Sequence, residues 1–183
     1  MRITVSGPPG SGTTSLARYI AAKYGLEFIS AGEVFRRLAR EHSMDLAEFG
    51  RLAESDPSVD RMIDERQKEI GETSDSIVVE GRLSGRMIAN ADLRIWLAAS
   101  LECRAKRIAG RDEMSEEEAL AYTRGRQHSE VTRYRNYYDI DINDLSSYDL
   151  VLSSETFGVD ALGAIVDVAI TCFQQQRKVL QER

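Results

Sequence analysis

The stretch RITVSGPPGSGTT, residues 2–14, decides the fold of this 183-residue chain. Its first part, Arg2–Ser6, is a short β-branched run and predicts a strand. A glycine-rich loop over residues 7–14 follows, and it leads into a helix expected over residues 15–24. The loop has the phosphate-binding pattern G-x-x-x-x-G-K-[ST], except that Thr13 stands in place of the Lys.

This loop predicts a site for a phosphate chain. Glycines adopt backbone angles that other residues avoid, so successive N–H groups point inward, and the positive end of the next helix adds to them. Thr14 occupies the hydroxyl position that would hold magnesium. The missing charge at Thr13 leaves two explanations: another cation replaces the Lys, or the loop binds a nucleotide without catalysing a reaction.

Size and composition indicate an ordinary globular protein of one domain. Hydrophobic residues make up 42% and charged residues 30%, and the net charge of −6 argues against broad nucleic-acid binding. Cys103 and Cys172 lie far apart without metal-ligand spacing, which favours free thiols in a reducing compartment. No stretch has the pattern of a signal peptide or the length of a membrane span. We therefore expect a cytoplasmic protein without membrane contact.

Five strand candidates alternate with helices along the chain. They cover residues 2–6, 27–30, 76–80, 93–98 and 148–152. This alternation predicts an α/β fold: a five-stranded parallel sheet flanked by helices on both faces, with ligands at the carboxyl ends of the strands. Gly7, Gly32, Gly81 and Ser100 each follow a strand, so we expect them to gather on that edge.

The expected helices cover residues 15–24, 33–41, 45–54, 59–70, 101–109, 115–134 and 158–176. Asp45 with Glu48, and Ser115 with Glu118, have the spacing of capping boxes. The mixed charge of the three helices between residues 31 and 75 predicts solvated, partly mobile surface. Gly110 is expected to interrupt the helix before it and to form a hinge with residues 112–114.

Arginines at helical spacing are the second functional signal. Arg104, Arg107 and Arg111 are three and four residues apart, so they share one helix face beside the expected hinge. This face predicts a lid that closes over a nucleotide. The alternative is a solvated face paired with acids, which is how most charge runs are used.

A second set of charged residues, Arg126, Glu130 and Arg133, also shares one helix face. It predicts either a surface salt bridge or an arginine clamp on phosphate that the acid keeps in register. Arg36 and Arg82 lie shortly after strands and are candidates to face the phosphate of an acceptor.

Glu80 ends a strand beside the phosphate loop. An acid here either orients magnesium through water or accepts a hydrogen bond from Thr14, or it lies in solvent at the strand end. Phosphoryl transfer needs a metal and several cations around two substrates held in line, so the acid and the arginines suit that chemistry.

Taken in order, these segments resemble the cytidylate kinases, most closely the short archaeal-type form. The resemblance covers residues 1–157 and is carried by the phosphate loop and five further segments. Those segments are residues 30–36 (SAGEVFR), 79–82 (VEGR), 90–97 (NADLRIWL), the Arg104, Arg107 and Arg111 face, and the Arg126, Glu130 and Arg133 set.

The resemblance implies a nucleoside monophosphate kinase of the P-loop NTPase fold, which transfers the γ-phosphoryl group of ATP to CMP or dCMP with Mg²⁺. It implies one domain with its core over residues 1–30, 76–109 and 146–183. A helical insert that binds the monophosphate is expected over about 31–75, and a lid with a long helix over about 110–145. We expect a monomer without a nucleic-acid partner.

The resemblance also assigns residues to ATP binding, CMP binding, catalysis and magnesium binding. ATP is expected at Gly7, Pro8, Pro9, Gly10, Ser11, Gly12, Thr13, Thr14, Ser15 and Arg104. The acceptor CMP is expected at Gly32, Arg36, Arg82, Arg126, Glu130 and Arg133. The implied catalytic residues are Arg107, Arg111, Arg126 and Arg133, and magnesium is assigned to Thr14 and, through water, to Glu80.

Two positions depart from the family pattern. Thr13 replaces the loop Lys, and Leu83 stands where bacterial-type relatives carry an acid that reads cytosine. The first departure concerns the cation that serves the donor phosphates, and the second concerns the choice among CMP, dCMP and UMP. Two alternatives stay open: another small-molecule kinase of the shikimate- or adenylate-kinase type, and a nucleotide-binding sensor without catalysis.

Overall fold

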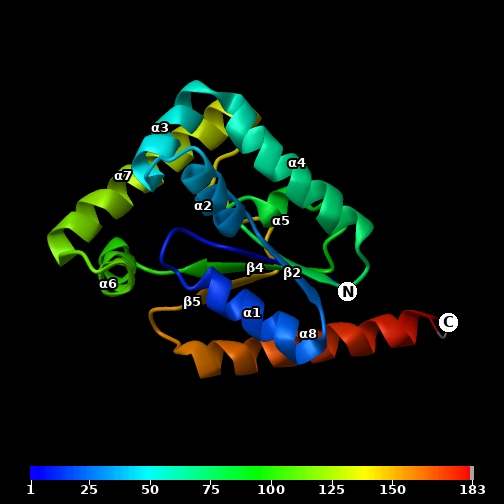
Figure 1. The fold of residues 1–183 in the computed structure, drawn as a ribbon. Helices are drawn as coiled ribbons and strands as arrows, with labels where there is room; N and C mark the ends of the chain where they lie inside the picture. Colours follow the sequence, from blue (N-terminus) through cyan, green and yellow to red (C-terminus); the bar gives the residue numbers. More distant parts are fainter. Residues whose placement is uncertain (182–183) are drawn as a thin grey trace.

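The structure is a computed structural model that describes residues 1–181, apart from the side chains of Arg66, Leu180 and Gln181. A central sheet separates two groups of helices (Figure 1). In the described part of the chain, no helix is both long enough and apolar enough to cross a membrane.

The sheet has five parallel strands, as predicted. They are β1 (Arg2–Ser6), β2 (Glu27–Ser30), β3 (Ile77–Glu80), β4 (Leu93–Ala98) and β5 (Leu150–Ser153), in the spatial order β2-β3-β1-β4-β5. The register pairs Val5 with Glu80 and Glu80 with Ser30. Because all strands run the same way, their carboxyl ends share one edge, and the residues that follow the strands gather there.

Eight helices lie between and after these strands in the described residues. They are α1 (Thr13–Tyr24), α2 (Ala31–Glu41), α3 (Leu46–Ser55), α4 (Pro57–Thr73), α5 (Ser84–Met87), α6 (Leu101–Asp112), α7 (Glu116–Tyr138) and α8 (Val159–Gln181). The four-residue helix α5 was not predicted. Both capping boxes are confirmed, at Asp45 with Glu48 and at Ser115 with Glu118.

The expected interruption at Gly110 is wrong. Helix α6 continues through this glycine to Asp112 and ends at Glu113, whose φ of 55° is left-handed. A glycine inside a helix costs only about 1 kcal/mol relative to alanine. Ile108 and Ala109 are buried in a cluster with Ala119 of α7, and this packing holds the last turn of α6 together.

The main core lies between the sheet and the helices α1 and α8, which cover one face (Figure 1). Ile3, Val5 and Ile95 from the strands pack there with Ile20 of α1 and Ile170 of α8, and all five are fully buried. A smaller cluster around Val79 and Ile88 covers the opposite face. This packing fixes β1 and the loop that follows it.

Helices α2, α3 and α4 form a second core of their own. With α7, which packs against α3, they lie above the carboxyl edge of the sheet (Figure 1). Phe49 and Ala53 of α3 are buried against Ala39 of α2 and against Val59 and Ile63 of α4. The expectation of a merely solvated surface is therefore wrong. These helices are amphipathic, and their charges lie outside an apolar seam that the charge-rich composition conceals.

Candidate active site

The phosphate loop has the backbone that its glycines predict. Gly10 and Gly12 have φ values of 82° and 90°, a region that favours glycine. A Cβ atom on Gly10 would lie 2.7 Å from the carbonyl oxygen of Arg104, so no side chain fits there. No side chain caps α1 and no acid stands in its first turn, which leaves its N–H groups available to an anion.

Thr13 and Glu80 form the polar floor beside this loop. Thr13 Oγ1 donates to Glu80 Oε1 at 2.7 Å, and Ser30 Oγ donates to the other carboxylate oxygen. Glu80 is buried, so the solvent alternative for this acid is wrong. The expected donor, Thr14, is also wrong, because Thr13 makes this bond. The residue in the Lys position therefore anchors the acid and supplies no charge.

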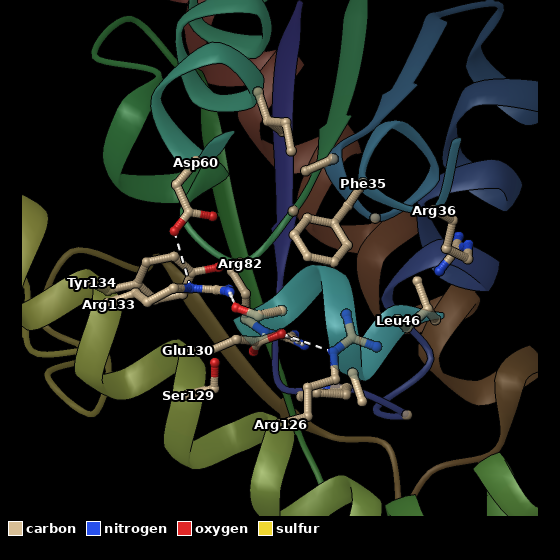
Figure 2. A pocket seen from close by; sticks show the side chains of 18 of the residues that line it. Phe35, Arg36, Leu46, Asp60, Arg82, Arg126, Ser129, Glu130, Arg133 and Tyr134 are labelled. Carbon is tan, nitrogen blue, oxygen red and sulfur yellow. Dashed lines mark hydrogen bonds and ion pairs between the residues drawn. The ribbon is translucent and has the colours of Figure 1, made fainter. Parts of the chain in front are cut away.

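One cavity of about 380 Å³ joins the phosphate loop to a helical arm, by which we mean α2, α3 and α4 together with α7. Gly10, Thr13 and Thr14 line its end at the loop, and most of the other lining residues belong to α2, α3, α4 and α7. Arg82, after β3, and Arg111 of α6 also line it. Figure 2 shows Arg36 and Asp60 on opposite sides of this space, with Phe35 between them. The site thus has room for a phosphate chain and for a second group beyond it.

Glu130 organises two of the predicted arginines inside this cavity. Arg82 Nε donates to Glu130 Oε2 at 2.5 Å, and Arg126 Nε donates to Oε1 at 3.0 Å (Figure 2). Burial alone would raise the pKa of Glu130, but Arg82, Arg126 and Arg133 lower it to about 2. The acid therefore stays ionised and keeps both guanidinium groups at the wall of the cavity. The expected ion pair of Arg126 with Glu130 is therefore present, but it is not on the surface, because Glu130 is buried.

Three guanidinium groups crowd the end of the cavity near the phosphate loop. Arg36, Arg111 and Arg126 all line it. Burial, together with the charges of Arg126 and Arg111, lowers the pKa of Arg36. Arg36 forms no ion pair with any residue that the structure describes, and Arg111 pairs only with its neighbour Asp112, at 2.6 Å. Arg36 therefore lies at this end of the cavity without an ion-pair partner among the described residues, and an anionic ligand would supply one.

Arg104 and Arg107 support the phosphate loop from outside the cavity. Arg104 Nη1 donates to the carbonyl of Pro9 at 3.1 Å, and its Nη2 donates to Gln127 at 2.6 Å. Arg107 donates to the hydroxyl and carbonyl of Ser154 and, at 3.4 Å, to the carbonyl of Gly10. Among the described residues that line the cavity, Arg111 is the only one of the three arginines on the α6 face.

Arg133 lies at the other end of α7, within the helical arm. Its Nε is 3.0 Å from Asp60 Oδ2, and its Nη1 donates to the carbonyl of Gly50 at 3.3 Å. Its guanidinium carbon lies 5.8 Å from the centre of the Phe35 ring. Arg133 thus pairs with an acid of α4 and not with Glu130. Arg82 is the second arginine that pairs with Glu130, beside Arg126.

Several residues of this cavity were not predicted from the sequence. Asp60 and Asp64 line it from α4, Phe35 from α2, and Ser129 and Tyr134 from α7. Burial raises the pKa of Asp60 to about 6 and that of Asp64 to about 7. Their i, i+4 spacing was a signal of a shared face, but similar spacings recur on any charged surface helix.

Magnesium fits the residues at the loop. Thr14 and Glu80 both line the cavity there. No cluster of three or more His, Cys, Asp or Glu in the described residues could hold a metal on its own. Mg²⁺ usually takes one or two protein ligands and completes its shell with water and substrate phosphates, so a site with one hydroxyl and one carboxylate suits it.

Solved kinase structures share this architecture. A shikimate kinase from Acinetobacter baumannii aligns with a TM-score of 0.59 at 15% identity, over 92% of this chain and 92% of that chain. A gluconokinase from Sinorhizobium meliloti 1021 aligns with a TM-score of 0.59 at 14% identity, over 95% and 96%. The fold, with its glycine-rich loop at the sheet edge, is therefore that of the P-loop kinases.

The family follows from the sequence of the whole chain. Residues 2–156 match the model of the cytidylate kinase-like family, and the chain belongs to that family. It is 75% identical to a cytidylate kinase of Methanoculleus marisnigri, over 97% of this chain and 98% of that protein. It is 63% identical to a cytidylate kinase of Methanoregula boonei, over 93% and 94%. The resemblance to archaeal cytidylate kinases is thereby confirmed.

Proposed function

We propose that this protein transfers the γ-phosphoryl group of ATP to CMP or dCMP, giving ADP and CDP or dCDP. One observation carries the proposal: a single cavity joins the phosphate loop to the helical arm, and Arg36, Arg111 and Arg126 crowd the junction. Phosphoryl transfer is catalysed mainly by positioning and by positive charge around the moving group, and this arrangement supplies both.

The donor lies on the phosphate loop in this proposal. Residues 7–15 hold the phosphates of ATP, with backbone N–H groups supplied by all of them except Pro8 and Pro9. Arg104 supports the loop through the carbonyl of Pro9. Thr13 brings no charge. Arg36, Arg111 and Arg126 take the part that the Lys plays in other phosphate loops.

The acceptor lies between α2 and α7. Gly32, Arg36, Arg82 and Arg126 hold its phosphate, and Glu130 keeps the last two in place. When bound by Thr14 and, through water, by Glu80, magnesium would neutralise charge on the donor phosphates. Direct roles of Arg107 in catalysis and of α6 as a moving lid stay predictions, as do the monomeric state and the cytoplasmic location.

The test measures ADP formation from ATP with each acceptor in turn: CMP, dCMP, UMP, AMP and shikimate, and ATP alone. We expect CMP and dCMP to give the highest kcat/KM and ATP alone to give almost none, because closure over both nucleotides would exclude water. Turnover of another acceptor but not of CMP or dCMP would refute the base assignment. ATP binding without turnover of any acceptor would favour the sensor.

Two arginine variants test this proposal, one at the site and one at the surface as its control. Arg126→Ala is expected to lower kcat by about 100-fold or more, because it removes a positive charge from the transferring group. Arg37→Ala removes an exposed arginine of α2 that pairs with Glu41 at 3.7 Å, and it is expected to change kcat less than about twofold. Equal losses in the two variants would contradict the assignment of Arg126.

A further inference from the structure

We propose that Asp60 and Arg133 read the base of the acceptor, and that this pair selects cytosine over uracil. This inference rests on the proposed function. Neither the phosphate-loop pattern nor Leu83 explains how the base would be recognised. Leu83 is apolar and buried, so it cannot pair with the polar edge of a base.

The two residues lie at the end of the acceptor site away from the phosphate. Arg133 is seven residues beyond Arg126 on α7, which is about 10 Å along a helix. Asp60 comes from the first turn of α4. Figure 2 shows this pair on the side of the cavity opposite Arg36. A nucleotide whose phosphate lies at Arg36 and Arg126 would therefore extend its base toward Asp60.

The pair has unused hydrogen-bonding capacity, although it is buried. Asp60 and Arg133 are each only 5% exposed. Their closest atoms, Oδ2 and Nε, are 3.0 Å apart, yet neither atom has a hydrogen bond of acceptable angle. The hydroxyl of Ser129, which also lines the cavity, has no partner among the described residues. Buried polar atoms without partners cost free energy, and a polar ligand would supply the partners.

The walls around this pair suit a flat ring. Phe35 faces the guanidinium group of Arg133 at 5.8 Å and is held edge-on by Phe49, with ring centres 4.9 Å apart. Ile63 and Leu46 add apolar surface to the same cavity. A planar base would contact aromatic and aliphatic atoms on its faces and the charged pair at its edge.

Cytosine matches the charged edge, and uracil opposes it. Cytosine carries an amino donor at C4 beside acceptors at N3 and O2, which complement the carboxylate of Asp60 and the N–H groups of Arg133. Uracil instead presents an oxygen to the carboxylate and an N–H group to the guanidinium. Adenine also has an amino group beside a ring nitrogen, so this pair would not exclude it. The size of the cavity must exclude the larger purine.

The first experiment compares kcat/KM for CMP and UMP in the wild type and in Asp60→Asn. We expect the CMP to UMP ratio to fall about tenfold or more in the variant, with little change in the KM for ATP. A general loss of structure would lower kcat/KM for both nucleotides alike. An unchanged ratio, beside normal CMP turnover in the wild type, would overturn this inference and leave the proposed function intact. Absent CMP turnover in the wild type would refute the proposed function itself.

A change in the ligand tests the same contact without relying on one variant. The 5′-monophosphate of pyrimidin-2-one riboside lacks the amino group of CMP. We expect this loss to lower kcat/KM about tenfold or more in the wild type and only slightly in Asp60→Asn. Should Asp60→Asn not fold, Asp60→Glu keeps the charge beside Arg133 but moves the carboxylate, and we expect the same pattern. Equal costs in wild type and variant would contradict the contact.

Asp64→Asn is the matched control. Asp64 is one turn further along α4 and lines the same cavity, but its carboxylate accepts a hydrogen bond from Tyr138 at 2.7 Å. We expect this variant to keep the wild-type CMP to UMP ratio. A changed ratio in Asp64→Asn, with an unchanged one in Asp60→Asn, would overturn the assignment.

Discussion

At the scale of single residues, Glu130 is the acid that holds the arginines of the site in place. It is buried and pairs with Arg82 and Arg126, so two guanidinium groups depend on one carboxylate. A buried pair of this kind adds little stability over apolar packing, but removing one partner leaves an uncompensated charge. Its value to the protein is therefore positional, since it holds two cations at the cavity while leaving them free to bind phosphate.

Glu130→Gln is expected to lower the free energy of unfolding by about 3 kcal/mol at pH 7. The folded-state pKa of about 2 lies below the usual 4.5, so the ionised group stabilises the fold above pH 4.5. That contribution is lost as the pH falls from 4.5 toward 2. Urea titrations at pH 7 and pH 3 should therefore show a smaller difference between wild type and variant at pH 3.

The control for this change is Glu65→Gln, which alters an exposed acid of α4. Its effect should stay within about 0.5 kcal/mol at both pH values. A difference between wild type and Glu130→Gln that is the same at pH 3 as at pH 7 would show that the carboxylate charge is not what stabilises this site.

At the scale of elements, the apolar seam of α2, α3 and α4 positions one half of the site. Phe35 and Arg36 are neighbours on α2, and Asp60 lies in the first turn of α4, so the spacing of these helices sets the shape of the acceptor end. Phe49 is fully buried at the centre of that seam. Its packing should therefore affect binding of the acceptor more than binding of ATP.

Phe49→Ala is expected to destabilise the protein by about 3–5 kcal/mol, because it removes a large buried ring and leaves a cavity. In protein that remains folded, the KM for CMP should rise several-fold more than the KM for ATP. Thermal unfolding and steady-state kinetics measure the two effects. Met62→Ala, at an exposed position of α4, is the control, and equal changes in the two KM values would contradict the separate role of this seam.

The elements themselves could largely be predicted from sequence. Short strand-like runs that alternate with helices indicated all five strands, and the spacing of Asp45 with Glu48 marked the start of α3. The ends of the helices were harder to predict from the sequence. Gly110 looks like a terminator on its own, but burial of Ile108 and Ala109 against α7 outweighs the cost of one glycine.

At the scale of the whole molecule, the sheet edge and the helical arm meet across one cavity. Helical spacing predicted the pair of Arg126 with Glu130 on one helix. It could not predict partners from elsewhere in the chain, such as Asp60 for Arg133, because these two residues lie 73 residues apart (133 − 60). The loop pattern predicted the phosphate end. The base end required the tertiary structure, since Asp60 resembles any other charge on a surface helix until its burial is known.

The most direct test of the account is a crystal structure with a bisubstrate ligand in which five phosphates link adenosine to cytidine. We predict that the phosphates lie between the loop over residues 7–15 and the guanidinium groups of Arg36, Arg111 and Arg126, with the cytosine amino group at Asp60. A structure in which these guanidinium groups point into solvent, or in which the cytosine lies away from α4, would contradict the account.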